Sequence, residues 1–325
     1  MNPFLIIILI LLYSSQSINN FNNDTIKPVI GIYGNSDPEN GDKNVDGTYY
    51  PISYIYWLES AGAQVMAIHY WYPFDVIDEI LYKINGILFL GGSRNIHQDY
   101  IHKEGLWEIK AKYIMQLCLK YKIPFWGTCQ GFQLMGILLS NNFTLLRKNF
   151  DDNDVLHNLE ITNNTKTSNM YKLFTEKDFN ILQNNNSTIY NHNFGFYPKE
   201  YHNEKVLNEI TIVTSISEDK NGLKFINSFE GKNESLKFYA VQYHPEKNPY
   251  KRKTYELEQN IESLKVSQKL VLNFIQEVKQ NKNRFESNEN NEGDRAQFDF
   301  FDTYNGTPNC IYSKQEEKCY FKKKE

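Results

Sequence analysis

Short apolar segments alternate with amphipathic segments through the first 140 residues, and this alternation limits the choice of fold more than any other feature of the chain. The apolar, strand-like segments cover residues 27–33, 64–69, 85–90 and 123–128. The helix-like segments cover residues 51–61, 104–121 and 130–139. Apolar strands joined by crossover helices form a parallel sheet with helices packed on its faces. The sequence therefore predicts an α/β sandwich.

The pattern changes after residue 140, where asparagine-rich loops separate short strands. The strands at 210–216 and 223–229 look antiparallel. A last apolar strand at 238–243 comes before a long helix expected over 255–278. A smaller antiparallel element is therefore expected beside the parallel sheet.

A single large domain is expected over residues 26–280, followed by a polar extension over 281–325. Cys310 and Cys319 lie in this extension, which has little apolar content of its own. A disulfide between them would close a loop, and two free thiols are the alternative.

Residues 1–17 have the features of a signal peptide. The apolar run from Phe4 to Tyr13 is too short to span a bilayer as a helix, and Ser15-Gln16-Ser17 suits cleavage near Ser17. The terminal amine is the one positive charge before the run, and a buried N-terminal strand is the alternative. We expect a mature chain without a membrane span that is secreted, lysosomal or both.

Seven sequons agree with this route and predict a glycoprotein, although a chain so rich in asparagine contains some sequons by chance. They begin at Asn23, Asn142, Asn163, Asn185, Asn186, Asn233 and Asn305. The formal net charge of −4 gives no reason to expect nucleic acid or an anionic membrane as a partner. The sequence has neither an HExxH motif nor paired CxxC motifs, so we expect no metal and no other cofactor.

Cys129 is the first candidate for chemistry. Gly127 and Gly131 flank it at the spacing of a nucleophile elbow, between a predicted strand and the helix that begins at Gln130. Small neighbours let strand and helix approach closely while the nucleophile projects beyond the sheet. The helix N-terminus is expected to lower the pKa of the thiol. The alternative is a small buried hydrophobe, which is the expectation for Cys118 on the apolar stripe of a helix.

A thiol nucleophile needs a base, and His244 has the best context because it directly follows an apolar strand. Glu246 comes two residues later and can orient the imidazole. Gly91-Gly92 ends another apolar strand, where an amide can complete an oxyanion hole with the amide of Gln130. Each feature has an ordinary alternative, a loop histidine or a simple turn, but their combination favours thiol acyl transfer.

Five longer sequence segments, which include these motifs, carry a resemblance to a known family. They are KPVIGIY at 27–33, YYPISYIYWLESAGAQV at 49–65, NGILFLGGS at 85–93, PFWGTCQGFQ at 124–133 and FYAVQYHPEKNPY at 238–250. With them the chain resembles the γ-glutamyl hydrolase family of the class I glutamine amidotransferase-like superfamily, from about Pro28 to the tail. The resemblance implies a flavodoxin-like three-layer sandwich with a mostly parallel central sheet. Leu90 departs from the family, many of whose members have proline before the glycine pair.

Carried over by position, the resemblance implies that Cys129 is the nucleophile, His244 the acid and base, and Glu246 the third member of the triad. The backbone amides of Gly92 and Gln130 would form the oxyanion hole.

Two further residues are candidates for substrate binding. His192, in YNHNFGF, matches a histidine that the family keeps near its active site, and a loop histidine is the alternative. Arg94 follows the glycine pair and can bind substrate carboxylates, and a solvated loop arginine is the alternative.

The implied reaction is hydrolysis of γ-glutamyl amide bonds in folate or antifolate polyglutamates, through a cysteine thioester and without a cofactor. The resemblance also allows a homodimer. One alternative is a glutaminase of the amidotransferase type, which breaks the same kind of bond and releases ammonia. The other is a secreted glycoprotein that keeps the fold as a binding module.

Overall fold

The computed structural model describes residues 27–36, 47–94, 96, 105–249, 261–284, 309–312 and 317–322. The predicted signal peptide at 1–17 and the sequons at Asn23 and Asn305 lie outside these residues. The first part of the helix expected over 255–278 also lies outside them.

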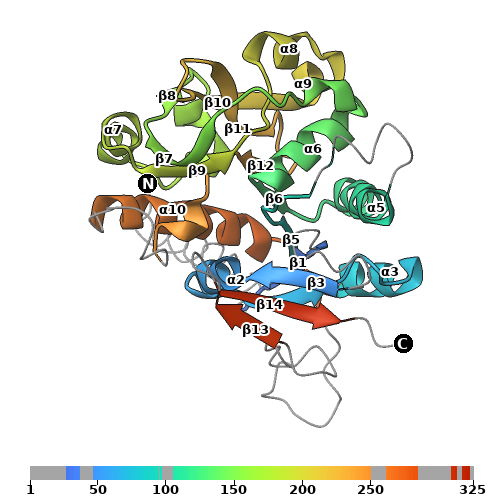
Figure 1. Cartoon of the computed structure of the whole chain (residues 1–325). Helices are drawn as coiled ribbons and strands as arrows, with labels where there is room; N and C mark the ends of the chain where they lie inside the picture. The colour runs from blue at the N-terminus through green and yellow to red at the C-terminus, as the bar shows by residue number, and fades with distance from the viewer. Residues whose placement is uncertain are drawn as a thin grey trace, which may run out of the picture.

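An eight-stranded sheet forms the centre of the molecule (Figure 1), in the order β4-β1-β5-β6-β12-β11-β10-β8. Its strands are β1 (Val29–Tyr33), β4 (Gln64–Ile68), β5 (Gly86–Phe89), β6 (Phe125–Thr128), β8 (Glu160–Ile161), β10 (Thr211–Glu218), β11 (Lys224–Gly231) and β12 (Phe238–Val241). The five strands from β4 to β12 pair in parallel, and the last three join in antiparallel fashion. The predicted mostly parallel sheet with a smaller antiparallel element is confirmed.

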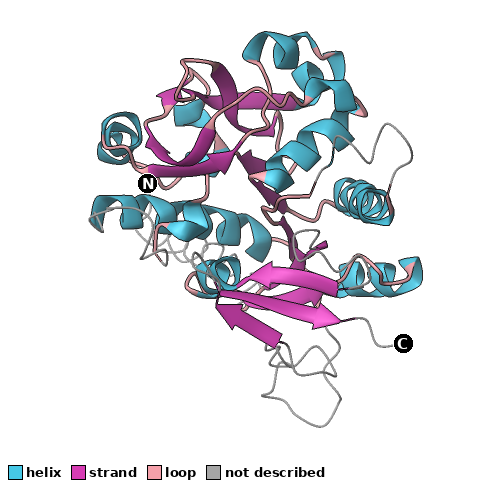
Figure 2. Ribbon diagram, viewed as in Figure 1, coloured by secondary structure: helices cyan, strands magenta, loops and turns pink. Residues whose placement is uncertain are grey.

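Helices cover both faces of the parallel part (Figure 2). They are α2 (Ile52–Glu59), α3 (Phe74–Lys83), α5 (Leu106–Tyr121), α6 (Gln130–Ser140) and α10 (Ile261–Lys279). Successive strand residues point to opposite faces, so Leu88 packs in one buried cluster with α2 and α10, and Ile87 and Phe89 pack in another with α3, α5 and α6. The result is the expected three-layer sandwich. None of the described helices is long and apolar enough to cross a membrane.

The asparagine-rich region after residue 140 contains more regular structure than the sequence predicted. It holds the strand pair β7 (Asp152–His157) and β9 (Thr188–His192) and the helices α7 (Glu176–Asn184), α8 (Pro198–Asn203) and α9 (Lys205–Ile210). The helix α7 begins with a capping box, in which the Asp178 carboxylate accepts hydrogen bonds from the Thr175 backbone N–H and hydroxyl at 2.6 Å. The capping box therefore specifies the start of α7, and the buried side chains of Tyr201 and Leu207 anchor α8 and α9 despite the polar composition.

Part of the polar extension returns to the body of the molecule. The strands β13 (Asn309–Tyr312) and β14 (Glu317–Lys322) form an antiparallel pair, and β14 pairs with β3 (Gly47–Pro51). With β2 (Asn35–Ser36) they make a second sheet in the order β13-β14-β3-β2. This sheet was not predicted from the sequence, because its strands are far apart in the chain.

The backbone register places Cys310 directly opposite Cys319. Opposite residues of an antiparallel pair have Cα atoms about 4.5–5.5 Å apart, which lies within the range of disulfides. We therefore predict a Cys310–Cys319 bond in protein made in an oxidising compartment. Peptide mapping without reduction should recover the two cysteines in one linked pair and Cys118 and Cys129 as free thiols. Alkylation of both tail cysteines in folded, unreduced protein would contradict the prediction.

Candidate active site

The backbone at Cys129 makes a sharp turn between β6 and α6. Its φ of 52° and ψ of −107° are unusual for a residue with a side chain. A Cβ on Gly131 would lie 2.0 Å from the carbonyl oxygen of Phe89, and one on Gly127 would lie 2.5 Å from the sulfur of Met135. Both positions therefore require glycine. The segment has the strand–turn–helix geometry that the G-x-C-x-G spacing predicts.

His244 and Cys129 flank the same glycine. A Cβ built on Gly91 would lie 3.0 Å from His244 Cε1 and 3.3 Å from Cys129 Cβ. The Nδ1 atom of His244 lies 2.7 Å from Oε1 of Glu246, whose side chain is fully buried. An ionised carboxylate only accepts, so Nδ1 carries the proton and donates it. The Nε2 atom is then the basic nitrogen, as a base for a cysteine requires.

The backbone amides of Gly92 and Gln130 both lie near the Cys129 sulfur, where they act as donors that lower the pKa of the thiol. The amide of Gly91 is used elsewhere, because it donates to the hydroxyl of Tyr54 at 2.9 Å. This contact explains why the second glycine of the pair, and not the first, faces the sulfur. The same hydroxyl lies 3.4 Å from His244 Nδ1. Sequence reasoning missed Tyr54, which no motif marks.

The Gln130 amide at the helix N-terminus lowers the pKa of Cys129 as expected, but the expectation of a net lowering is wrong. Burial raises the pKa of the Cys129 thiol to about 12, because the thiolate loses its hydration. The positive charge of Lys247 lowers this pKa and the negative charge of Glu246 raises it. The amides of Gln130 and Gly92 lower it further but do not offset burial. Cys129 therefore rests as a thiol and needs His244 to remove its proton during attack.

The raised pKa of Cys129 predicts how alkylation of the free enzyme depends on pH. Only the thiolate reacts with iodoacetamide, and far below a pKa the thiolate fraction rises about tenfold per pH unit. We expect the rate of Cys129 alkylation, measured by mass spectrometry, to rise steadily from pH 7 to 9.5. A preformed thiolate–imidazolium pair would instead give a plateau across this range, and a plateau would contradict the thiol resting state.

His192 ends β9, beside the sulfur but directed elsewhere. The carbonyl of its neighbour Asn191 lies 3.9 Å from Cys129 Sγ. The His192 ring donates from Nδ1 to the carbonyl of Phe194 at 2.9 Å, and its Nε2 lies 3.6 Å from Asp152 Oδ2. Burial lowers the pKa of His192 to about 3, so the ring is neutral at physiological pH.

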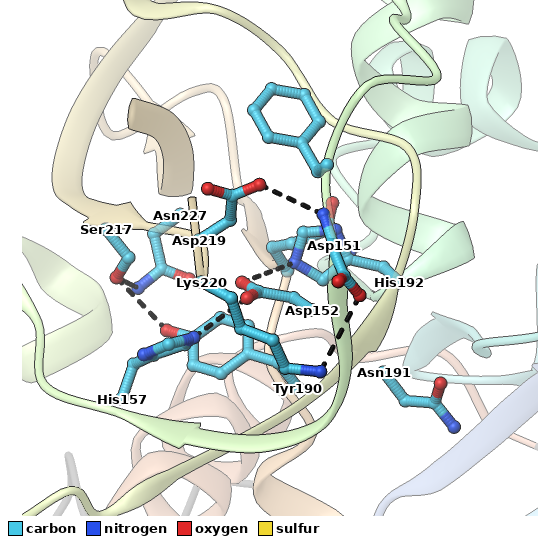
Figure 3. A network of polar contacts seen from close by, with 12 residues as sticks. Asp151, Asp152, His157, Tyr190, Asn191, His192, Ser217, Asp219, Lys220 and Asn227 are labelled. Carbon is cyan, nitrogen blue, oxygen red and sulfur yellow. Dashed lines mark hydrogen bonds and ion pairs between the residues drawn. The ribbon is translucent and has the colours of Figure 1, made fainter. Parts of the chain in front are cut away.

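A buried polar network continues from His192 (Figure 3). The other carboxylate oxygen of Asp152 lies 2.8 Å from Nε2 of His157. The hydroxyl of Tyr190 lies 3.2 Å from that of Ser217, which accepts from Asn227 at 3.0 Å. These contacts connect β7, β10 and β11 with β9, the strand that carries Asn191. A substrate contact of the His192 ring stays a prediction.

Arg94 is tied to α5. Its Nε lies 3.1 Å from Oε1 of Glu108, a carboxylate that is 1% exposed, and its guanidinium lies over the ring of Trp107. The Arg94 side chain is 19% exposed. A substrate carboxylate would have to share this guanidinium with Glu108, so substrate binding by Arg94 also stays a prediction. Within the part of the chain that the structure describes, no group of three or more His, Cys, Asp or Glu residues is arranged to hold a metal.

Several known proteins are similar to this chain. A family model, that of the class-I glutamine amidotransferases, matches residues 50–264. Gamma-glutamyl hydrolase B of Dictyostelium discoideum is 31% identical over 76% of this chain and 69% of its own length. The γ-glutamyl hydrolase of Rattus norvegicus is 31% identical over 86% of both chains, and that of Homo sapiens is 30% identical over 90% of this chain and 89% of its own.

Among solved structures, the glutaminase domain of the Trypanosoma brucei CTPS, with bound acivicin, has a similar fold. It aligns with a TM-score of 0.51 over 78% of this chain and 94% of that domain, at 18% identity. This likeness concerns the fold and carries no argument about the substrate.

Proposed function

The chain belongs to the γ-glutamyl hydrolase family of the class-I glutamine amidotransferases and hydrolyses γ-glutamyl amide bonds; from this premise we propose that its substrates are folates with a tail of γ-linked glutamates. Antifolates with the same tail are substrates of the same kind. The observation that carries the catalytic assignment is the convergence of Cys129, the His244–Glu246 pair and two backbone amides around Gly91-Gly92.

The reaction begins with the thiol of Cys129. As the sulfur bonds to the γ-carbonyl carbon, its proton passes to Nε2 of His244, and the Glu246 carboxylate stabilises the imidazolium that forms. The carbonyl oxygen becomes an oxyanion and accepts hydrogen bonds from the amides of Gly92 and Gln130, which already point at the sulfur. In the buried site these bonds are stronger than in water.

The tetrahedral intermediate then collapses. Its C–N bond breaks, the imidazolium of His244 protonates the departing amine, and a γ-glutamyl thioester remains on Cys129. Water attacks the thioester after His244 removes its proton, and the sulfur leaves and regains a proton from the imidazolium. The products are a free γ-carboxylate and an amine, with the enzyme restored.

A glutaminase would use the same chemistry with ammonia as the leaving group. The hydrolase is favoured by three relatives that match over most of their length and carry the name γ-glutamyl hydrolase. The positive charge of Lys247 lowers the pKa of Cys129 and is compatible with a substrate that carries carboxylates. No sequence motif marked this lysine as a functional residue.

We also propose that the chain passes through the secretory pathway, on the strength of residues 1–17 and the sequons. Of the described sequons, those at Asn163, Asn185, Asn186 and Asn233 are exposed. Asn142 is half-buried, and its side-chain amide donates to Glu204 at 2.7 Å, which makes it a poor glycan acceptor. The predicted Cys310–Cys319 bond requires the same oxidising route.

Substitution of the nucleophile tests the proposed function. We expect purified protein to shorten folate pentaglutamate, followed by chromatography, and Cys129→Ala to abolish the shortening because no thioester can form. Cys118→Ala is the matched control, since Cys118 lies on the buried face of α5, and it should keep the activity at some cost in stability. Ammonia release from glutamine with no action on the pentaglutamate would sink the proposal in favour of a glutaminase.

Glu246 offers a second test of the mechanism. A glutamine at this position keeps the shape but cannot stabilise the imidazolium by charge, so we expect Glu246→Gln to lower kcat by about 10²-fold or more with little change in KM. The exposed Glu209→Gln serves as the control and should behave like the wild type. A kcat within about twofold of the wild type for Glu246→Gln would remove Glu246 from the proposed triad.

A further inference from the structure

We propose that the side-chain amides of Gln130 and Asn35 are positioning groups that hold the Gly92 amide in place for the oxyanion. The proposal rests on the function proposed above for Cys129. It assigns Gln130 a second task, because its backbone N–H already faces the sulfur.

The Gln130 side chain grips the loop that follows β5 at two points. Its Oε1 accepts a hydrogen bond from the backbone N–H of Arg94 at 3.3 Å, and its Nε2 donates to the carbonyl of the same residue. A backbone N–H only donates and a carbonyl only accepts, so these contacts fix the orientation of the glutamine amide. The residue is buried, which makes the hydrogen bonds costly to lose.

Asn35 completes the arrangement from the second sheet. Its Nδ2 donates to Gln130 Oε1 at 2.6 Å, and the residue is fully buried. Both amides pack directly against Gly92. A Cβ at Gly92 would lie 1.8 Å from Asn35 Nδ2 and 2.8 Å from Gln130 Oε1.

The contacts link the two halves of the oxyanion hole. One donor is the backbone N–H of Gln130, and the other belongs to a loop that the side chain of the same residue holds. The distance between the donors is therefore fixed through one residue. A shift of about 1 Å in a catalytic group can reduce turnover by about 10²-fold, so the clamp matters for rate more than for substrate affinity.

Three variants test the clamp: Gln130→Leu, which keeps the backbone amide, Asn35→Ala and the double variant. With folate pentaglutamate, and in parallel with γ-glutamyl-4-nitroanilide, we expect each single variant to lower kcat by about 10- to 100-fold while KM changes by less than about threefold. Because both residues act through one contact, the double variant should lose little more than the stronger single variant.

Alkylation of Cys129 by iodoacetamide separates positioning from general damage. This reaction displaces iodide and forms no oxyanion, so a displaced Gly92 amide affects its rate only through the pKa of Cys129, which that amide lowers. The alkylation rate should therefore fall by less than kcat in all three variants. The matched control is Asn85→Ala. Asn85 is a buried amide at the opposite end of β5, where it accepts from Val29 N and donates to the carbonyls of Asn281 and Asn283. Its loss should lower the melting temperature and leave kcat unchanged.

Two results would overturn the proposal. One is an unchanged kcat in Gln130→Leu and Asn35→Ala, and the other is a parallel fall in kcat and alkylation rate, which would indicate a disordered cysteine site. An incorrect substrate proposal can be told apart from an incorrect clamp proposal. If the substrate is wrong, the wild type leaves the pentaglutamate intact, while cleavage of the nitroanilide still measures the kcat of the variants.

Discussion

The strained backbone at Cys129 is the constraint on which the rest of the site depends. A left-handed φ at a residue with a side chain costs about 1–3 kcal/mol and persists only where the surroundings enforce it. The enforcement is specific: the Cys129 N–H donates to the carbonyl of Val241 at 2.8 Å, and Gly131 packs against the carbonyl of Phe89. Those two carbonyls belong to β12 and β5, the strands on either side of β6. The contacts that hold the turn therefore also bring the loops after β5 and β12 to the sulfur, one with the amide of Gly92 and the other with His244.

Burial of Cys129 then determines which charged species the site stabilises. The same low-polarity surroundings that strengthen hydrogen bonds to an oxyanion oppose a thiolate in the resting enzyme. The high pKa of Cys129 follows, as does the need for a base that is itself buried and already oriented. The His244–Glu246 contact at 2.7 Å meets that need, because it fixes the tautomer before substrate arrives. The charge separation that attack creates is shared between an imidazolium beside a carboxylate and an oxyanion beside two amides.

The sequence predicts the parallel sheet and the elbow well because both have local signals. Apolar runs mark β1, β4, β5 and β6, and the glycines around Cys129 mark the turn. Three kinds of feature could not be predicted from the sequence. The helices α7 to α9 lie in an asparagine-rich region, where α7 begins with a capping box and α8 and α9 each bury one apolar side chain. The helix α3 (Phe74–Lys83) was not predicted, although it has buried apolar residues. Tyr54 and Asn35 act through contacts with loops distant in the chain, which no spacing reveals. The sign of the Cys129 pKa shift depends on burial of the sulfur, which outweighs the helix N-terminus and is not readable from a motif.

The second sheet, in the order β13-β14-β3-β2, links both ends of the described chain to the oxyanion hole. Asn35 lies in β2 and is the register partner of Tyr49 in β3, and Tyr49 is in turn the partner of Tyr320 in β14. Asn35 and Tyr49 both pack against Gly92, where a Cβ would meet the asparagine amide at 1.8 Å and the tyrosine hydroxyl at 2.8 Å. The edge of the oxyanion hole is thus supported by a sheet whose strands come from opposite ends of the sequence. Strand pairing over so long a separation costs more chain entropy than local contacts. A Cys310–Cys319 bond would lower only the entropy cost of forming the local β13–β14 hairpin, whose strand β14 pairs with β3. In this arrangement the strand β14 supports β3, and β3 with β2 supplies the Tyr49 and Asn35 side chains that pack against Gly92.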